Sequence, residues 1–272
     1  MSRIRETFEQ LSKNSSGAFI PYVCAGDPDG GFTLDLVRSL CDSGADMIEL
    51  GIPFSDPVAD GPVIQKAMGR SLSAGFKVAH VFEIISDLRA GGIAQPIIVM
   101  TYYNPVLKLG PKEFCARLAG AGADGVLVVD LPPEESGELE SAASENGLDI
   151  IRLIAPNTSE ERITQILAKA SGFVYLVSVA GTTGVRTHLP ASTSALLRDV
   201  SSRSQLPVAL GFGISAPEHV IEAMECGASG IVEGSKLISL YSEHPTERDL
   251  TLAIIREHAQ GMKAATKRCF RK

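Results

Sequence analysis

Short apolar runs recur along the chain, separated by longer stretches in which apolar residues fall three or four positions apart. The short runs have the length of buried strands, and the longer stretches have the period of amphipathic helices. The runs that predict strands are 18–24, 46–50, 96–101, 125–129, 149–154, 173–177, 207–210 and 230–233. The stretches that predict helices are 2–11, 32–43, 63–74, 78–90, 112–120, 134–146, 159–170 and 247–267. Strands and helices therefore alternate along the chain.

This alternation predicts a parallel sheet with right-handed crossovers. Eight strands in 272 residues, with no linker or break in composition, favour a single domain over residues 1–272. The expected fold is α/β, a closed (β/α)8 TIM barrel with an extra helix at its N-terminus. An open doubly wound sheet is the alternative, but it usually has fewer strands and a glycine-rich first turn. The first turn here, Ala25-Gly-Asp-Pro28, differs from that motif.

Composition narrows the class of protein. The chain is 44% hydrophobic and 21% charged, which is typical of a soluble globular protein. It contains no run of the ~20 apolar residues that span a bilayer, so we expect no membrane segment. Residues 2–11 carry charges throughout and lack the apolar core of a signal peptide, which predicts a cytoplasmic protein. The net charge of −7 and the lack of a basic stripe argue against a nucleic-acid partner.

Cysteine and histidine positions argue against a metal site. The five cysteines are widely dispersed, and no two form a C-x-x-C pair. The five histidines are equally scattered. Structural zinc sites and disulfide frameworks need clustered ligands or paired cysteines, so we expect neither.

One long loop stands out, in the stretch 49–65, which reads ELGIPFSDPVADGPVIQ. Prolines and glycines within it exclude regular structure. It carries three carboxylates, Glu49, Asp56 and Asp60. Glu49 interrupts a strand that should be buried on both faces. Either Glu49 makes a structural buried hydrogen bond, or the loop carries a functional site.

Barrel enzymes place their chemistry at the C-terminal ends of the strands. This rule gathers the following residues around one mouth: Tyr22, Glu49, Met100, Leu127, Tyr175, Gly211–Gly213 and Gly234–Ser235. Glycine-containing turns at 181–184, 211–215 and 234–235 follow the last three strands. Glycines let backbone N–H groups approach a ligand closely, and a helix N-terminus favours an anion. These late loops therefore predict a phosphate site.

The remaining mouth residues are apolar or aromatic. They are Tyr22, Phe54, Ile64, Met100, Leu127, Tyr175 and Phe212. Each one alone fits a core position, but together they would form a flat apolar slot beside the phosphate site and two carboxylates. Such surroundings raise the pKa of a carboxylic acid toward neutrality, which suits proton transfer. The pattern predicts an aromatic phosphorylated substrate.

Six segments together resemble the tryptophan synthase alpha subunit family over essentially the whole chain. They are P-Y-V-C-A-G-D-P (21–28), the loop 49–65, Y-Y-N-P (102–105), A-G-T-T-G (180–184), G-F-G-I-S (211–215) and E-G-S (233–235). The resemblance implies a (β/α)8 lyase that cleaves indole-3-glycerol phosphate to indole and glyceraldehyde 3-phosphate in the last steps of L-tryptophan biosynthesis. It also implies a pyridoxal-phosphate β subunit as the partner in an α2β2 heterotetramer, with no metal or cofactor in this subunit.

The resemblance also assigns residues. It gives Glu49 the acid/base role and sets Asp60 opposite the indole nitrogen. The substrate-binding positions it implies are Tyr22, Ile64, Met100, Leu127, Tyr175, Thr183 and Phe212, and the phosphate-binding positions are Gly184, Gly213, Gly234 and Ser235. The chain departs from the common family pattern at Cys24, Val179 and Thr182, near the first and sixth loops.

For the partner interface, we expect the rim of the mouth, at Asp56, Pro57, Asn104 and Pro132. Two other functions remain open at this point. One is a different phosphate-binding barrel enzyme, such as an isomerase of aromatic amino-acid synthesis, which would need an acid–base pair at other strand ends. The other is a non-catalytic subunit that only activates a partner, which would tolerate loss of Glu49 or Asp60.

Overall fold

Parallel strands form the centre of the molecule. The computed structural model describes residues 2–178, 188–244 and 246–267. Its strands are β1 (Ala18–Cys24), β2 (Ile48–Gly51), β3 (Ile97–Thr101), β4 (Gly125–Val128), β5 (Asp149–Ile150), β6 (Arg152–Ile154), β7 (Val174–Val177), β8 (Val208–Gly211) and β9 (Gly230–Glu233). They are hydrogen-bonded in the order β5-β4-β3-β2-β1-β9-β8-β7-β6. The two outermost strands in this order, β5 and β6, are separated in the chain only by Ile151.

The predicted strand 149–154 therefore consists of two short strands, and the barrel closes because each of them pairs with a different neighbour. β5 pairs with β4, and the N–H of Ile151 donates to the carbonyl of Val126 at 3.0 Å. β6 then pairs with β7. One continuous segment thus bonds first to one neighbour and then to the other, which explains why nine strands replace the predicted eight without changing the (β/α)8 architecture.

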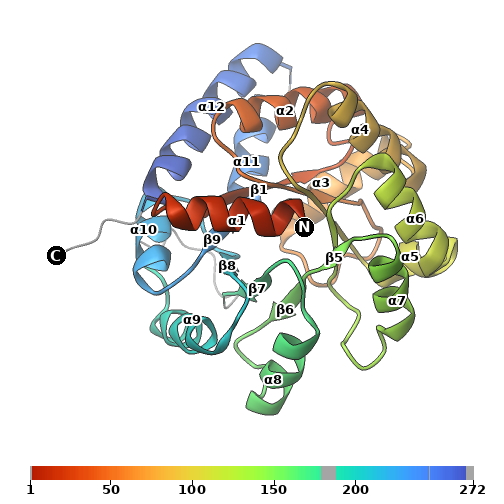
Figure 1. Cartoon of the computed structure of the whole chain (residues 1–272). Coiled ribbons are helices and arrows are strands. Elements are labelled where there is room, and N and C mark those ends of the chain that lie inside the picture. Colours follow the sequence, from red (N-terminus) through yellow and green to blue (C-terminus); the bar gives the residue numbers. More distant parts are fainter. Residues whose placement is uncertain (1, 179–187, 245, 268–272) are drawn as a thin grey trace.

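Helices surround the strands as an outer layer (Figure 1). They are α1 (Arg3–Lys13), α2 (Gly30–Asp42), α3 (Pro62–Ser73), α4 (Val78–Ala90), α5 (Tyr103–Leu109), α6 (Pro111–Ala121), α7 (Gly137–Glu145), α8 (Glu160–Lys169), α9 (Ala191–Arg203), α10 (Pro217–Glu225), α11 (Ser235–Glu243) and α12 (Arg248–Ala265). The periodic pattern gave no bounds for α5, α9, α10 or α11. The described part of the chain has no helix long and apolar enough to cross a membrane.

The N-terminal helix α1 lies across the end of the barrel at which the strands begin (Figure 1). Ile4 and Phe8 on its inner face are buried, and the ring of Phe8 packs against that of Phe173 with centroids 5.7 Å apart. Burying two large apolar side chains against the barrel stabilises the fold by several kcal/mol at about 25 cal/mol per Å². The predicted extra helix therefore covers the end of the barrel at which the strands begin.

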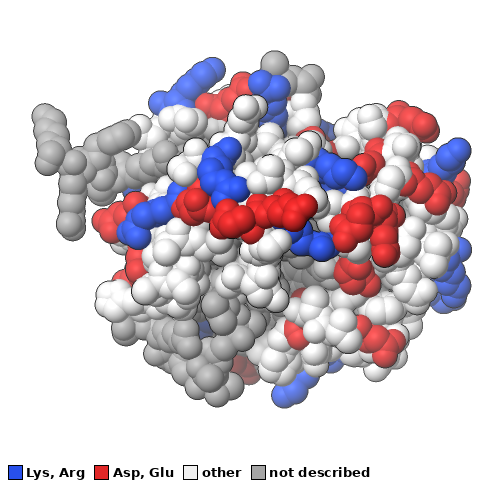
Figure 2. Space-filling model, turned by 90° about the horizontal axis from the view of Figure 1, so that it is seen from below, with Lys and Arg blue, Asp and Glu red and all other residues white. Residues whose placement is uncertain are grey.

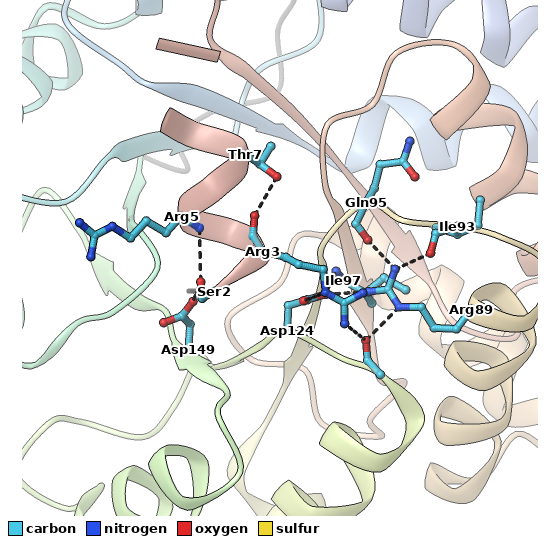
Figure 3. A network of polar contacts seen from close by, with 11 residues as sticks. Ser2, Arg3, Arg5, Thr7, Arg89, Ile93, Gln95, Ile97, Asp124 and Asp149 are labelled. Atoms are coloured by element: carbon cyan, nitrogen blue, oxygen red, sulfur yellow. Dashed lines mark hydrogen bonds and ion pairs between the residues drawn. The ribbon is translucent and has the colours of Figure 1, made fainter. Parts of the chain in front are cut away.

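A polar network fixes α1 in this place (Figure 3). The Asp124 carboxylate, directly before β4, receives Arg3 Nε at 2.7 Å, Arg89 Nη2 at 2.7 Å and the backbone N–H of Ile97 at 2.8 Å. Arg89 also donates to the carbonyls of Ile93, Gln95 and Gly122. The network thus joins α1, α4 and the starts of β3 and β4.

The outer surface mixes charges of both signs. Figure 2 shows acidic and basic side chains interleaved on the face that carries α8. There Arg203 bonds Glu160 and Asp199, and Arg162 bonds Glu134 at 2.9 Å. Water screens such exposed pairs, so they add little to stability. The buried apolar core, rather than this surface, holds the barrel together.

Candidate active site

The register of the strands places the expected mouth residues on the same face of the sheet. Residues paired across neighbouring strands point to the same face of a sheet, and so do residues two apart on one strand. Tyr22 pairs with Glu49, Glu49 with Ile98, and Met100 with Leu127. Tyr22, Glu49, Met100 and Leu127 therefore line one face at the C-terminal ends of β1–β4. All four side chains are buried.

Glu49 is a carboxylic acid in apolar surroundings. Its side chain is 4% exposed. Burial disfavours the charged form, and the negative charge of Asp60 disfavours it further, so the pKa of Glu49 rises from 4.5 to about 8. At neutral pH Glu49 therefore holds a proton that it can give to a substrate. The direction of this shift is the one that the sequence analysis expected for a carboxyl group in apolar surroundings.

A tyrosine hydroxyl forms a hydrogen bond with the carboxyl group of Asp60. The long loop brings Asp60 to the mouth just before α3, and Tyr102 Oη donates to its Oδ2 at 2.6 Å. The same hydroxyl accepts from the N–H of Ala59 at 2.9 Å. Burial raises the pKa of Asp60, and the hydrogen bond from Tyr102 opposes that rise. Asp60 Oδ1 is buried with no partner among the described residues, which leaves an acceptor for a ligand.

Two tyrosines share the space with these carboxylates. Tyr22 and Tyr175 are both buried, and burial raises the pKa of each well above its usual value, with further increments from both Glu49 and Asp60. Their hydroxyls lie over glycines of the neighbouring strands. A Cβ added at Gly51 would come within 2.2 Å of Tyr22 Oη, and one at Gly211 within 2.3 Å of Tyr175 Oη. Glycine at these two strand ends is what admits the tyrosine rings.

Two pairs of aromatic rings belong to the mouth. Phe54 stacks on Tyr102 with ring centroids 5.1 Å apart, and Phe212 meets Tyr175 edge-on at 6.5 Å. Ile64, on the first turn of α3, is also buried. The apolar and aromatic side chains expected around the mouth are thus buried or partly buried, and Tyr102 lies among them. The sequence analysis quoted Tyr102 within a motif but gave it no role; its place directly after a barrel strand was the signal that could have revealed it.

The late loops place three of the four expected phosphate positions at helix and turn starts. Ser235 is the first residue of α11, and Gly234 precedes it with no side-chain cap on the helix. The first N–H groups of an α-helix have no intrahelical partner, so they remain open to an anion. Gly213 has φ +80°, a backbone conformation that favours glycine. Gly184, like Thr183, Val179 and Thr182, lies outside the described residues.

The described residues contain no group of three or more His, Cys, Asp or Glu side chains placed to hold a metal ion. Four cysteines of the described part are free and buried, namely Cys24, Cys41, Cys115 and Cys226. Burial raises the pKa of Cys115 to about 11 and that of Cys41 to about 12, so these thiols stay protonated at neutral pH.

Known proteins match this arrangement closely. The family model for the tryptophan synthase alpha chain matches residues 8–267. The chain belongs to the tryptophan synthase alpha chain family. The alpha chain of Carboxydothermus hydrogenoformans is 42% identical over 269 residues, covering 98% of this chain and 100% of the relative. That of Methanosarcina barkeri is 44% identical over 264 residues, covering 97% and 98%.

Solved structures of the tryptophan synthase family share the fold. The alpha subunit from Legionella pneumophila superposes with a TM-score of 0.89 at 36% identity and covers 98% of both chains. A chain of the Pyrococcus furiosus tryptophan synthase complex superposes with a TM-score of 0.83 at 40% identity, covering 91% of this chain and 98% of that one. The protein is accordingly a lyase of tryptophan biosynthesis that acts on indole-3-glycerol phosphate.

The rim positions expected to meet a tryptophan synthase β subunit follow β2, β3 and β4. Asp56 and Asn104 are exposed, and Pro57 and Pro132 are partly buried. Asn104 does not lie in a loop, because it belongs to the first turn of α5. Two large apolar side chains that the sequence analysis did not single out are exposed in the same segments: Val58, 84% exposed, and Leu107, 58% exposed.

Proposed function

We propose that Glu49 and Asp60 together carry out the retro-aldol cleavage of indole-3-glycerol phosphate to indole and glyceraldehyde 3-phosphate. The observation that supports this most directly is the burial of Glu49 beside Asp60, which raises the pKa of Glu49 to about 8. A group with a pKa near the working pH both gives and takes a proton efficiently. Other phosphate-binding barrel enzymes and a purely structural subunit have no need of such a pair at this strand end.

In the proposed reaction the proton count balances on Glu49. Its carboxylic acid gives a proton to the indole ring carbon that carries the glycerol chain, and positive charge develops on the ring. The Asp60 carboxylate accepts the indole N–H on its free Oδ1 and stabilises that charge. The Glu49 carboxylate then takes the proton of the adjacent glycerol hydroxyl while the carbon–carbon bond breaks. Indole and glyceraldehyde 3-phosphate leave, and Glu49 is again protonated.

The other predicted residues would hold the substrate. The ring would lie in the apolar slot formed by Tyr22, Ile64, Met100, Leu127, Tyr175 and Phe212, each of which is buried or partly buried. The phosphate would lie at Gly213, Gly234 and Ser235, where the N-terminus of α11 offers free N–H groups. Thr183 and Gly184 are proposed members of the same two sets from the family resemblance alone.

The test is indole release from indole-3-glycerol phosphate by the purified chain. We expect the Glu49→Gln variant to fold normally and to lose about 10²- to 10⁴-fold in rate, as for removal of a general acid–base group. Glu138→Gln, on an exposed position of α7, is the matched control and should keep the parental rate. Release by Glu49→Gln within threefold of the parent would remove Glu49 from the mechanism.

We further propose a tryptophan synthase β subunit as the partner, docked on the rim at Asp56, Pro57, Asn104 and Pro132. Support comes from the Pyrococcus furiosus relative, whose structure is described as an α2β2 complex with mutual activation of its subunits. The same α2β2 composition, pyridoxal phosphate in the partner, no cofactor in this chain and a cytoplasmic location complete the proposal. Indole is small and apolar, so direct transfer to a docked partner would prevent its loss.

A further inference from the structure

A buried glutamate lies directly behind the proposed phosphate site. Glu233 is the last residue of β9, and Gly234 and Ser235 follow it at the start of α11. Glu233 pairs with Pro21 in the register of β9 and β1, so it points away from the barrel interior, opposite to Tyr22. Its side chain is 0% exposed. A carboxyl group thus lies between the strands and the helix layer, one residue from the backbone donors of the site.

A histidine on α12 is the hydrogen-bond partner of the Glu233 carboxyl group. His258 on α12 lies with Nε2 2.8 Å from Glu233 Oε1, and its side chain is 17% exposed. Oε2 is buried with no partner in the described part of the chain. α11 and α12 pack against each other in the outer layer (Figure 1). The pair therefore connects α12 to the first residues of α11.

A negative charge on Glu233 would affect anion binding because Glu233 lies next to the N-terminus of α11. The N-terminus of α11 attracts anions through its free N–H groups and the helix dipole, and an uncompensated carboxylate nearby would oppose that attraction. His258 Nε2, 2.8 Å from Glu233 Oε1, is placed to compensate a negative charge on this carboxyl group. The positive charge of Lys236 on α11 also lowers the pKa of Glu233. On the β1 side, the neighbour is the uncharged Pro21.

We propose that His258 is a positioning residue for phosphate binding: it neutralises Glu233 and so keeps the N-terminus of α11 favourable to the substrate phosphate. This proposal rests on the phosphate site at Gly234 and Ser235. Neither residue of the pair touches the reacting atoms. The expected signature is a change in affinity for phosphate-bearing ligands, expressed in KM with kcat preserved.

The experiment measures the Kd of glycerol 3-phosphate, with indole as the probe that lacks phosphate. His258→Gln replaces the imidazole by a neutral amide and leaves Glu233 to titrate alone. Burial raises the pKa of Glu233 above its usual value, so the lone carboxyl is neutral at low pH and ionises as the pH rises. Relative to the parent at each pH, we expect His258→Gln to bind glycerol 3-phosphate about equally at low pH and about three- to tenfold more weakly once Glu233 is ionised. Indole binding should not change.

The double variant Glu233→Gln, His258→Gln separates charge from structure. Removing the carboxylate as well should restore parental affinity for glycerol 3-phosphate and remove the added pH dependence. Glu233→Gln alone should bind at least as tightly as the parent at every pH, which keeps the proposal testable should His258→Gln fold poorly. Glu257→Gln, an exposed neighbour on α12, is the control for a general change of charge.

The experiment distinguishes an error in the proposed phosphate site from an error in the proposed role of His258. If the parent does not bind glycerol 3-phosphate, or if Gly234→Val binds it as the parent does, the phosphate site itself is misplaced. If the parent binds it and Gly234→Val loses it, but His258→Gln matches the parent across the pH range, the role of His258 is wrong. Equal weakening of glycerol 3-phosphate and indole, unrescued by the double variant, would show that the pair only supports the fold.

Discussion

At the scale of single residues, burial rather than sequence neighbours sets the chemistry of the mouth. Glu49 and Asp56 belong to the same stretch, yet Glu49 is enclosed whereas Asp56 is exposed, and burial raises the pKa of Glu49 to about 8. Asp60 is enclosed too, but Tyr102 holds one of its oxygens. Burial raises the pKa of Asp60 as well, but the hydrogen bond from Tyr102 opposes that rise, so the two carboxyl groups of one site have different surroundings.

The raised pKa of Glu49 has a consequence for stability. Between the ordinary value of 4.5 and the folded value of about 8, the folded chain keeps a proton that the unfolded chain releases. Its contribution to the free energy of unfolding is therefore full below pH 4.5 and falls as the pH rises to 8. Urea unfolding of parent and Glu49→Gln across this range should show the parent losing stability relative to the variant. Parallel curves would mean that Glu49 titrates at its ordinary pKa.

Asp60 and Tyr102 can be separated by two substitutions. Asp60→Asn keeps size but removes the negative charge opposite the indole nitrogen, so we expect a large loss of indole release. Tyr102→Phe keeps the stack on Phe54 and removes one hydrogen bond to a charged group, so we expect a smaller loss of about tenfold. Tyr103→Phe, on a partly buried neighbour, should be silent. Full turnover in Asp60→Asn combined with inactivity in Asp60→Ala would show that hydrogen bonding, not charge, matters there.

At the scale of elements, the sequence predicted those whose pattern is local. The apolar runs that became β1–β4 and β7–β9 were predicted because strands buried on both faces read as continuous apolar runs. α5 was not, since it has seven residues and includes Pro105; proline is tolerated there because it lies in the first turn. The division of 149–154 into β5 and β6 depends on which neighbour each residue bonds, a property that no local pattern records.

The site shows the same division between local and long-range information. Glu49 could be proposed because it lies at a strand end and within a specific motif, and Asp60 because the same motif carries it; both roles stay predictions. The hydrogen bond from Tyr102 to Asp60 joins residues 42 positions apart in sequence, and the pair of Glu233 with His258 joins residues 25 apart. Such contacts arise only when the helices and loops are packed. The outcome for Thr183 and Gly184 lies outside the described residues.

The network under α1 should act on stability alone. Removing the carboxylate in Asp124→Ala leaves Arg3 and Arg89 without their shared partner and the N–H of Ile97 without its acceptor, so we expect a loss of about 3 kcal/mol in the free energy of unfolding. Glu9→Ala, which removes an exposed pair with Arg5 on the same helix, should change it by less than about 0.5 kcal/mol.

Urea unfolding measures both losses. Indole release per folded molecule should stay parental in both variants, because α1 lies at the end of the barrel opposite to Glu49. A large loss of activity in folded Asp124→Ala would show that the bottom of the barrel is coupled to its mouth.

At the scale of the whole molecule, the two ends of the barrel have separate tasks. The bottom is closed by α1 and its charged network, whereas the mouth carries the carboxylates, the glycine turns and the rim. This separation is general for (β/α)8 enzymes, in which residues at the strand C-termini serve catalysis and those at the opposite end serve stability. A partner that docks on the rim is therefore close to the chemistry and far from the elements that hold the fold.

The rim makes a prediction about the partner. Asp56 lies in the loop that also carries Asp60, so a contact there can report on the state of the active site. With the cognate β subunit added, we expect indole release by the parent to rise, and Asp56→Ala to lose most of that rise while keeping its unassisted rate. Coupling of this kind is typically about 1–3 kcal/mol, or 5- to 150-fold. A rise that is insensitive to substitution of both Asp56 and Asn104 would place the interface elsewhere.

The split of one strand at Ile151 divides the barrel into two halves with different duties. Everything proposed to make or break bonds, Glu49 and Asp60 with Tyr102, comes from the chain before the split, and every proposed phosphate contact comes from after it. Within the sheet, the halves are hydrogen-bonded at β1, whose first residues bond β9 and whose last bond β2, and at the split strand itself. The residues proposed to cleave the substrate and those proposed to bind its phosphate thus come from separate stretches of the sequence. A substitution in the second half can therefore change the affinity for the phosphate while the proposed acid, Glu49, stays unchanged.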